Sequence, residues 1–179
     1  MRGGEVQFEL RPAELRLAFD QSFAAAPQAE LLEFEDLLAI GVDGDHYAIR
    51  LSEISGLFVD KTVARLPSPL SQLRGIAALR GALVPVYDLR ALLGYSAGES
   101  PRWLVVAART PVGLAFDAFD SHLRMPSTAI AAAESAEHSR QHIREVLRSE
   151  ERAWPIVSLA SLIEAIARLA RRAGAKQEK

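Results

Sequence analysis

Short apolar runs, each about the length of a β-strand, repeat along the chain from residue 36 onwards. The first two runs flank an Asp-Gly-Asp turn signal at residues 43–45. In the second run, Tyr47, Ile49 and Leu51 occupy every other position, between smaller or polar residues. Because side chains alternate between the two faces of a strand, this pattern predicts a β-hairpin with one buried face.

The later apolar runs continue the same pattern. Strands are expected over residues 56–66, within the stretch 75–94, and over two runs between 102 and 119. A second hairpin is expected over residues 144–158, whereas the alanine-rich segment 127–140 is either a surface helix or a mobile loop. Many short strands at close intervals, with helices mainly at the ends, predict a mainly β barrel architecture with helical additions.

An N-terminal extension, residues 1–34, differs from the rest in its periodicity. Pro12 suits the first turn of a helix, and Leu15, Phe19 and Phe23 follow at four-residue spacing on one helical face. A short amphipathic helix is only marginally stable alone in water, so this apolar face should pack against another protein surface. Packing on its own domain is the favoured interpretation, and binding a partner is the alternative.

A second helical pattern lies near the C-terminus. Apolar residues recur at helical spacing over residues 159–169, and Ser161 and Glu164 stand in the order of a capping box. The expected organisation is therefore the extension, one globular domain over residues 35–172, and a charged tail over residues 173–179.

The composition argues against several classes of protein and of functional site. The formal net charge is −2 and the pI is about 6.1, which gives no overall electrostatic reason to expect nucleic acid or an anionic membrane as a partner. Absence of cysteine excludes disulfides, thiolate metal sites and cysteine nucleophiles. The N-terminal residues lack a secretory apolar core, and the apolar runs are too short to cross a bilayer. We expect a cytoplasmic protein without membrane insertion.

No convincing catalytic constellation appears in the sequence. Common nucleophile-elbow and phosphate-loop motifs are missing, and His46 and His122 stand apart from any obvious partner. Catalytic groups can converge from distant positions, which lowers the enzyme hypothesis without eliminating it. The prediction is a protein without catalysis and without a cofactor.

The best metal candidate is weak. His138 and His142 are four residues apart, with Glu134 and Glu137 nearby as carboxylate ligands. Their polar, alanine-rich setting is more typical of a solvated helix face, so no metal site is predicted.

One stretch, from Gly75 to Gly94, contains several residues with special backbone preferences. Gly75 and Gly81 interrupt strands, which indicates a bulge, a bend or another backbone approaching closely. Pro85 lacks a donor, so its strand should lie at an edge or leave that position unpaired. Asp88 can cap a short helix that Gly94 ends.

Arg80 is the residue in this stretch that local backbone physics does not explain. A guanidinium beside a strand edge needs an acid partner to be fixed, and Glu53 is a plausible one. Arg80 is either a surface arginine without a special role or, anchored beside an apolar edge, an interface hot spot.

At these residues the chain resembles the CheW family, the coupling proteins of bacterial chemosensory arrays. The resemblance extends over about residues 36 to 170, roughly three-quarters of the chain. It rests on a central motif of glycine, L-R-G, a hydrophobic pair, P-V and D-L-R, here Gly75, Leu79-Arg80-Gly81, Leu83-Val84, Pro85-Val86 and Asp88-Leu89-Arg90.

The resemblance implies a fold, partners and a site. The implied fold is two intertwined five-stranded SH3-like β-barrels around a shared core. The implied function is a non-catalytic adaptor that links the cytoplasmic tips of methyl-accepting chemoreceptors to the regulatory domain of a CheA-type histidine kinase. Arg80 matches the family's receptor-interaction arginine, and Glu53 the acid that pairs with it. The expected protein-interaction residues are Glu53, Ile54, Gly75, Leu79, Arg80 and Gly81.

Two departures keep alternatives open. Ala78 replaces the asparagine often found before L-R-G, and the N-terminal extension lies outside the family's usual short start. A specialised variant with a single partner is therefore an alternative, and self-association stays open. A small β-barrel enzyme or a ligand-binding or metal-binding protein is the alternative from another class.

Overall fold

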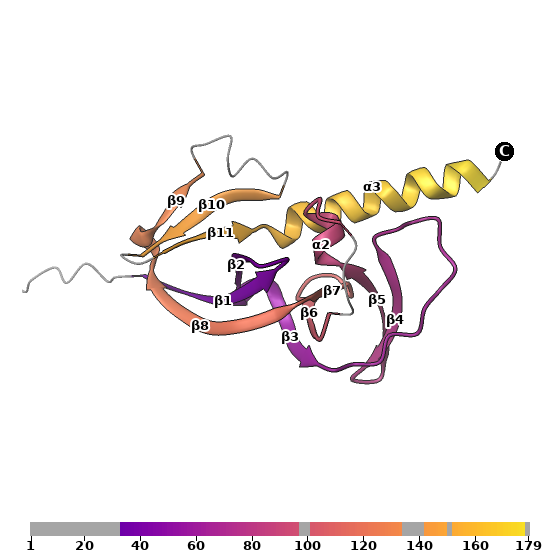
Figure 1. Ribbon diagram of the computed structural model, residues 1–179, viewed down its shortest axis with the longest axis horizontal. Helices are drawn as coiled ribbons and strands as arrows, with labels where there is room; N and C mark the ends of the chain where they lie inside the picture. The colour runs from indigo at the N-terminus through magenta and orange to yellow at the C-terminus, as the bar shows by residue number, and fades with distance from the viewer. Residues whose placement is uncertain (1–32, 97–100, 134–141, 150–151, 178–179) are drawn as a thin grey trace, which may run out of the picture. The chain divides into compact units, whose positions relative to one another are not determined.

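The computed structural model describes residues 33–96, 101–133, 142–149 and 152–177. These residues belong to one compact unit, Glu33–Lys179. The amphipathic helix expected between Pro12 and Phe23 lies outside the described residues, as does the part of the alanine-rich segment that follows Ala133. Two sheets and one long helix form the described part of this unit (Figure 1).

The first sheet has six strands in the order β8-β1-β2-β11-β10-β9. Neighbouring strands are antiparallel except β11 and β2, which are parallel. The predicted hairpins β1–β2 and β10–β11 both form. The strand bounds in chain order are β1 Phe34–Val42, β2 Asp45–Arg50, β8 Ala118–Pro126, β9 Ile130–Ala132, β10 Ile143–Arg148 and β11 Ala153–Val157.

The second sheet has five strands in the order β3-β6-β7-β5-β4, and only the β5–β7 pair is parallel among these described strands. The segment after β3 returns to the opposite edge, where Ala64 and Ile76 exchange two backbone hydrogen bonds of 2.8 and 2.9 Å. This bridge curls the sheet toward a closed barrel. The strand bounds are β3 Ile54–Val59, β4 Leu73–Leu79, β5 Ala82–Asp88, β6 Trp103–Ala107 and β7 Gly113–Phe116.

Four helical segments complete the part of the unit that the structure describes, namely η1 Leu51–Glu53, α2 Leu89–Leu92, η2 Ser127–Ala129 and α3 Leu159–Gln177. Ser127–Ala132, expected as a helix or loop, forms η2 and β9 instead. The added β9 gives the first sheet one strand more than the five expected.

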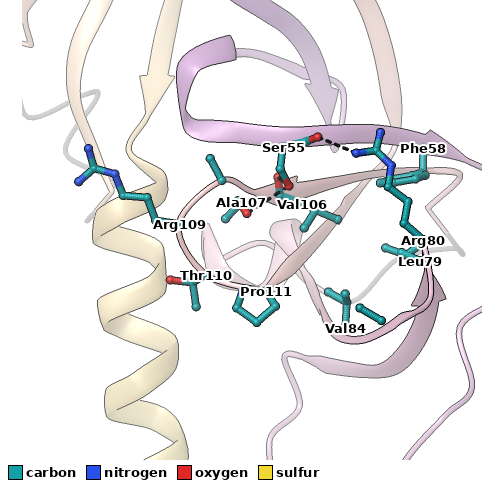
Figure 2. A pocket seen from close by; sticks show the side chains of 12 residues that line it. Ser55, Phe58, Leu79, Arg80, Val84, Val106, Ala107, Arg109, Thr110 and Pro111 are labelled. Atoms are coloured by element: carbon teal, nitrogen blue, oxygen red, sulfur yellow. Dashed lines mark hydrogen bonds between the residues drawn. The ribbon is translucent and has the colours of Figure 1, made fainter.

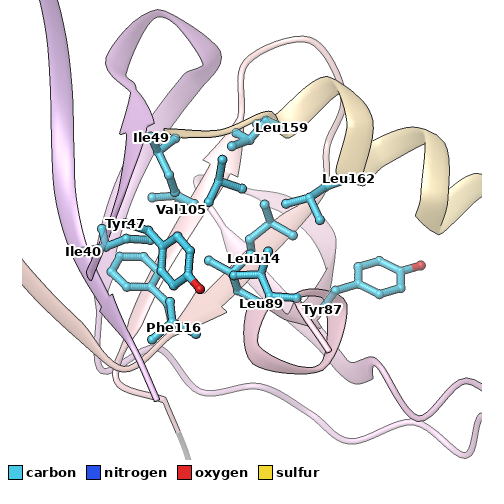
Figure 3. Packing of buried hydrophobic residues seen from close by; sticks show 14 of the residues in the cluster. Ile40, Tyr47, Ile49, Tyr87, Leu89, Val105, Leu114, Phe116, Leu159 and Leu162 are labelled. Carbon is cyan, nitrogen blue, oxygen red and sulfur yellow. The ribbon is translucent and has the colours of Figure 1, made fainter. Parts of the chain in front are cut away.

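Buried side chains form a small core within each sheet and a larger core between the sheets. Ala77, Val84 and Leu104 belong to the core of the second sheet, and Leu37 and Leu147 to that of the first. The shared core takes residues from both sheets, α2 and α3, including Ile40, Tyr47, Ile49, Tyr87, Leu89, Val105, Leu114, Phe116, Leu159 and Leu162 (Figure 3). Full burial of such a side chain contributes about 1.5–3 kcal/mol, so the shared core holds the two barrels together.

The one-sided burial expected for the β1–β2 hairpin is wrong in detail. Tyr47 and Ile49 are buried as predicted, but Ala48 is buried as well and Leu51 is 39% exposed. Tyr47 and Ile49 face the shared core, whereas Ala48 packs into the core of the first sheet. Both faces of the strand are therefore covered, and the chain turns into η1 at Leu51 before the alternation can continue.

The helix ends depend on side-chain caps. Asp88 accepts the Arg90 amide at 3.0 Å at the start of α2, as predicted, and Gly94 follows that helix with φ +85°. The capping box expected at Ser161 is wrong. Ser158 caps α3, because its Oγ accepts the Ser161 amide at 3.3 Å.

The α3 helix reaches Gln177, past the expected start of the tail at residue 173. Leu159 and Leu162 pack into the shared core. None of the described helices is both long and apolar enough to span a lipid bilayer.

Candidate protein-interaction site

Arg80 lies in the turn of the β4–β5 hairpin, in a backbone conformation that arginine rarely adopts. Leu79 and Ala82 form the last register pair, so the turn consists of Arg80 (φ +48°) and Gly81 (φ +81°). Positive φ at both central residues is what a type I′ turn requires. Left-handed backbone costs a residue other than glycine about 1–2 kcal/mol. The hairpin therefore carries local strain at the residue that the sequence singled out.

The Arg80 side chain reaches across to β3. Its Nη1 donates to the Ser55 carbonyl at 3.3 Å, and the guanidinium carbon lies 5.4 Å from the centroid of the Phe58 ring. A cation over an aromatic face is stabilised by about 0.5–1 kcal/mol at an exposed site. These contacts orient the guanidinium while leaving Arg80 exposed.

The expected ion pair between Arg80 and Glu53 does not form. Glu53 Oε2 instead accepts the Leu159 amide at 3.4 Å, and the Glu53 carbonyl accepts the Ala108 amide at 2.8 Å. Glu53 ends η1 and meets the first residue of α3, where unpaired amides attract a carboxylate. Its tertiary position at the helix start, rather than its charge alone, decides its partner.

A groove of about 310 Å³ lies beside Arg80; we call it the Arg80 groove. Apolar side chains from four strands line it, namely Phe58, Leu79, Ala82, Val84, Val106 and Ala107. The β6–β7 turn completes the lining with Ala108, Arg109, Thr110 and Pro111. Figure 2 shows Arg80 and Arg109 on opposite sides of this groove.

A second groove, of about 290 Å³, adjoins the first; we call it the Glu53 groove. Glu53 and Ile163 line it, and Ala107 and Arg109 line both grooves. Glu53 and Arg80 are thus brought to one region of the surface without touching.

The electrostatics of the Arg80 groove are positive. Among the residues that the structure describes, neither Arg80 nor Arg109 forms an ion pair. An apolar groove between two such cations is complementary to a segment with apolar side chains and flanking carboxylates. The groove offers a binding surface, and its described lining residues hold no constellation of nucleophile and base.

The other predicted residues have different positions. Leu79 lines the Arg80 groove, while Ile54 packs against the shared core. Gly81 supplies the turn. Gly75 has φ +145°, and a Cβ there would lie 2.0 Å from the Ala64 carbonyl oxygen, so this position requires glycine for the fold. Of the bulge, bend or close backbone approach expected at this glycine, the structure shows the close approach, and Gly75 lines neither groove.

Sequence reasoning missed several residues at the groove. Phe58 and Val106 look like ordinary strand residues, and Arg109 lies in a turn with no distinguishing signal. Leu83 is 70% exposed on the strand after the turn, next to Ala82 in the groove lining. An exposed leucine beside a hairpin tip cannot be recognised without the strand register.

Arg90, the arginine of the D-L-R motif, performs a structural task. Its guanidinium pairs with Asp43 in the β1–β2 turn and lies 3.5 Å from Asp117, and its side chain is only 13% exposed. The Asp43 amide also donates to Asp117 at 2.8 Å. These contacts join the turn of the first hairpin to α2 and to the bend between β7 and β8.

The three histidines that the structure describes are paired rather than isolated. His46 bonds to Asp120 and His122 to Asp36, each at 2.9 Å, which corrects the expectation that they lack partners. His142 is buried and its Nδ1 lies 2.9 Å from Ser161 Oγ. Within the described ranges no group of His, Asp and Glu side chains could hold a metal ion, and His138, Glu134 and Glu137 lie outside them.

Comparisons with known proteins agree with this architecture. A family model for the CheW-like domain matches residues 36–167. The chemotaxis protein CheW of Bacillus subtilis (strain 168) is 23% identical over 142 residues, which cover 76% of this chain and 91% of that protein. The crystal structure of the scaffolding protein TtCheW from Thermoanaerobacter tengcongensis superposes with a TM-score of 0.66 at 16% identity, covering 73% of this chain and 92% of that chain. The match confirms the expected pair of SH3-like barrels.

Proposed function

The chain belongs to the CheW-like domain family, and from this premise we propose that it is a non-catalytic adaptor of a chemosensory array. Its partners are the cytoplasmic tip of a methyl-accepting chemoreceptor and the regulatory domain of a CheA-type histidine kinase. Such an adaptor acts in the cytoplasm, where both partners present these domains. Its function is binding, and its specificity resides in surface geometry.

One observation carries the proposal: an arginine is held in strained backbone at the edge of an apolar groove. The strain at Arg80 is unnecessary for the hairpin, because glycine or asparagine would close the same turn more easily. Contacts to Ser55 and Phe58 preorient the guanidinium, which reduces the entropy that a partner must overcome on binding. Strained, preoriented side chains are typical of functional positions.

The groove also specifies the chemistry of the segment that binds. Phe58, Val84 and Val106 accept apolar side chains, and Arg80 and Arg109 accept carboxylates at the two sides. We assign the Arg80 groove to the receptor tip. A partner helix with apolar residues at helical spacing and acidic residues on either flank would satisfy both requirements.

The test measures receptor-tip binding by titration calorimetry, and kinase-domain binding separately. Arg80→Glu reverses the charge beside the groove and is expected to weaken receptor-tip binding more than about tenfold, equivalent to about 1.4 kcal/mol. Circular dichroism checks that the fold survives.

Arg124→Glu is the matched control. The Arg124 guanidinium carbon lies 5.6 Å from the centroid of the Phe34 ring on the first sheet, so the variant removes the same kind of pair elsewhere. Receptor-tip affinity should be retained. Equal losses in both variants, or normal binding by Arg80→Glu, would refute the assignment of the groove.

Two further outcomes separate the alternatives. Binding to only one of the two proteins would establish a specialised single-partner variant. Stoichiometric metal in the purified protein, together with no binding to either partner, would overturn the adaptor proposal in favour of a ligand-binding or metal-binding protein.

A further inference from the structure

We propose that a pocket between α2 and α3, on a different set of residues from the two grooves, binds a small oxyanion with phosphate or carboxylate groups. The pocket has a volume of about 320 Å³. It is lined by Gln72 before β4, by Ala91 and Leu92 of α2, by His142, and by Arg168 and Arg172 of α3. This site is independent of the proposed adaptor function.

Two arginines of α3 meet at this pocket. Arg168 and Arg172 are four residues apart, so both lie on one face of α3, and both line the pocket. Like charges at this spacing destabilise a helix. In the described part of the chain neither arginine has a carboxylate partner, and no carboxylate lines the pocket. A bound anion would supply the missing counter-charge.

A buried histidine also lines the pocket. His142 is only 3% exposed, and its Nδ1 is occupied by Ser161 Oγ at 2.9 Å. When the Ser161 hydroxyl donates to Nδ1, the hydrogen of the neutral ring resides on Nε2, which makes that nitrogen a donor. His142 lines the pocket, and in this tautomer its Nε2 can donate to an acceptor oxygen of a ligand.

The electrostatic potential at His142 is positive. Burial and the charge of Arg168 lower the pKa of His142, so the guanidinium acts on the ring. Asp88 is an acidic residue next to the pocket, because its amide donates to the carbonyl of the lining residue Gln72 at 2.8 Å. Its carboxylate is already paired with Arg74 at 2.8 Å. Guanidinium groups form paired hydrogen bonds with phosphate and carboxylate oxygens, which defines the class of ligand.

The experiment titrates the full chain with inorganic phosphate and with citrate, against sodium chloride at matched ionic strength. Calorimetry measures affinity, and NMR follows the ring signals of His142. We expect saturable binding and a shift of the His142 signals that chloride does not produce. Tighter phosphate binding assigns a phosphoryl ligand, and tighter citrate binding assigns a carboxylate ligand.

Matched variants locate the site. The double variant Arg168→Gln and Arg172→Gln should lose affinity at least about tenfold, because two charge-assisted hydrogen bonds are removed. Arg171→Gln should bind normally, since Arg171 does not line the pocket and its Nε donates to the Ala167 carbonyl at 3.2 Å. Absence of saturable binding, or equal losses in Arg171→Gln, would overturn the proposal.

Discussion

The β1–β2 and β4–β5 hairpins close with the same kind of turn but use it differently. Each has two central residues with positive φ, +56° and +83° at Asp43-Gly44 and +48° and +81° at Arg80-Gly81. Asp43 is tied into the molecule through Arg90 and Asp117. Arg80 instead lies over Phe58 at the edge of an open groove.

Under the proposed function, similar backbone geometry serves folding in one barrel and recognition in the other. Aspartate tolerates the left-handed region and its carboxylate is consumed by contacts within the domain. Arginine is poorly suited to that region, and its charge has no carboxylate partner in the described residues. The hairpin proposed for recognition therefore differs from the structural one in carrying a residue against local backbone preference.

The largest expected effect concerns the base of the β4–β5 hairpin. Gly75→Ala would place a Cβ 2.0 Å from the Ala64 carbonyl oxygen in backbone with φ +145°. Neither backbone can move without breaking the Ala64–Ile76 bridge, so unfolding free energy should fall by more than about 3 kcal/mol, measured by urea denaturation.

Alanine at the two turn glycines provides the control for that measurement. A Cβ added at Gly44 or Gly81 would meet no other atom within 4 Å, so only backbone strain remains. Gly44→Ala and Gly81→Ala should each cost about 1–2 kcal/mol. A loss at Gly75→Ala no larger than these would show that the close approach to Ala64 is not rigid.

The next prediction compares the contribution of Arg90, which holds the turn of the first hairpin, with that of Arg80 in the other hairpin. Arg90→Ala leaves Asp43 and Asp117 without their cation and should cost about 2 kcal/mol, since both carboxylates stay partly hydrated. Arg80→Ala should cost less than about 1 kcal/mol, because its contacts are exposed. Equal losses in thermal denaturation would contradict the proposed division of roles.

The smallest effect on stability is also the sharpest test of function. Arg80→Asn places a residue that tolerates left-handed backbone in the same turn, so the unfolding free energy should stay unchanged or rise by up to about 1 kcal/mol. Receptor-tip affinity, measured by calorimetry, should nevertheless fall more than about tenfold.

The reciprocal change is Asp43→Asn, which keeps the turn and weakens its ion pair with Arg90. Stability should fall by about 1 kcal/mol while receptor-tip affinity stays the same. Loss of affinity in Asp43→Asn, or none in Arg80→Asn, would remove the functional distinction between the hairpins.

Local patterns are sufficient to predict most elements. The turn at residues 43–45 and the cap at Asp88 follow from residues near in sequence. Partner choice is not predictable in the same way. The sequence suggests Arg80 as the partner of Glu53, whereas the actual partner is the Leu159 amide, more than one hundred residues away along the chain. It suggests no partner for His46, because Asp120 is also distant in sequence.

The candidate site is predictable only in part for the same reason. The L-R-G motif identifies Arg80 and Leu79, which do line the groove. Phe58 and Arg109 come from other strands and turns, and their approach to Arg80 depends on the pairing of β3 with β6 and of β6 with β7.

By itself the sequence determined where the turn of the first hairpin, the Asp88 cap and the glycines with special backbone fall, because these depend on conformational preferences of single residues and close neighbours. Only the tertiary structure decided which charges pair, which faces of a strand are buried and where the grooves open. Those outcomes depend on contacts between segments distant in sequence, such as the shared core and the hydrogen bond from the Leu159 amide to the Glu53 carboxylate.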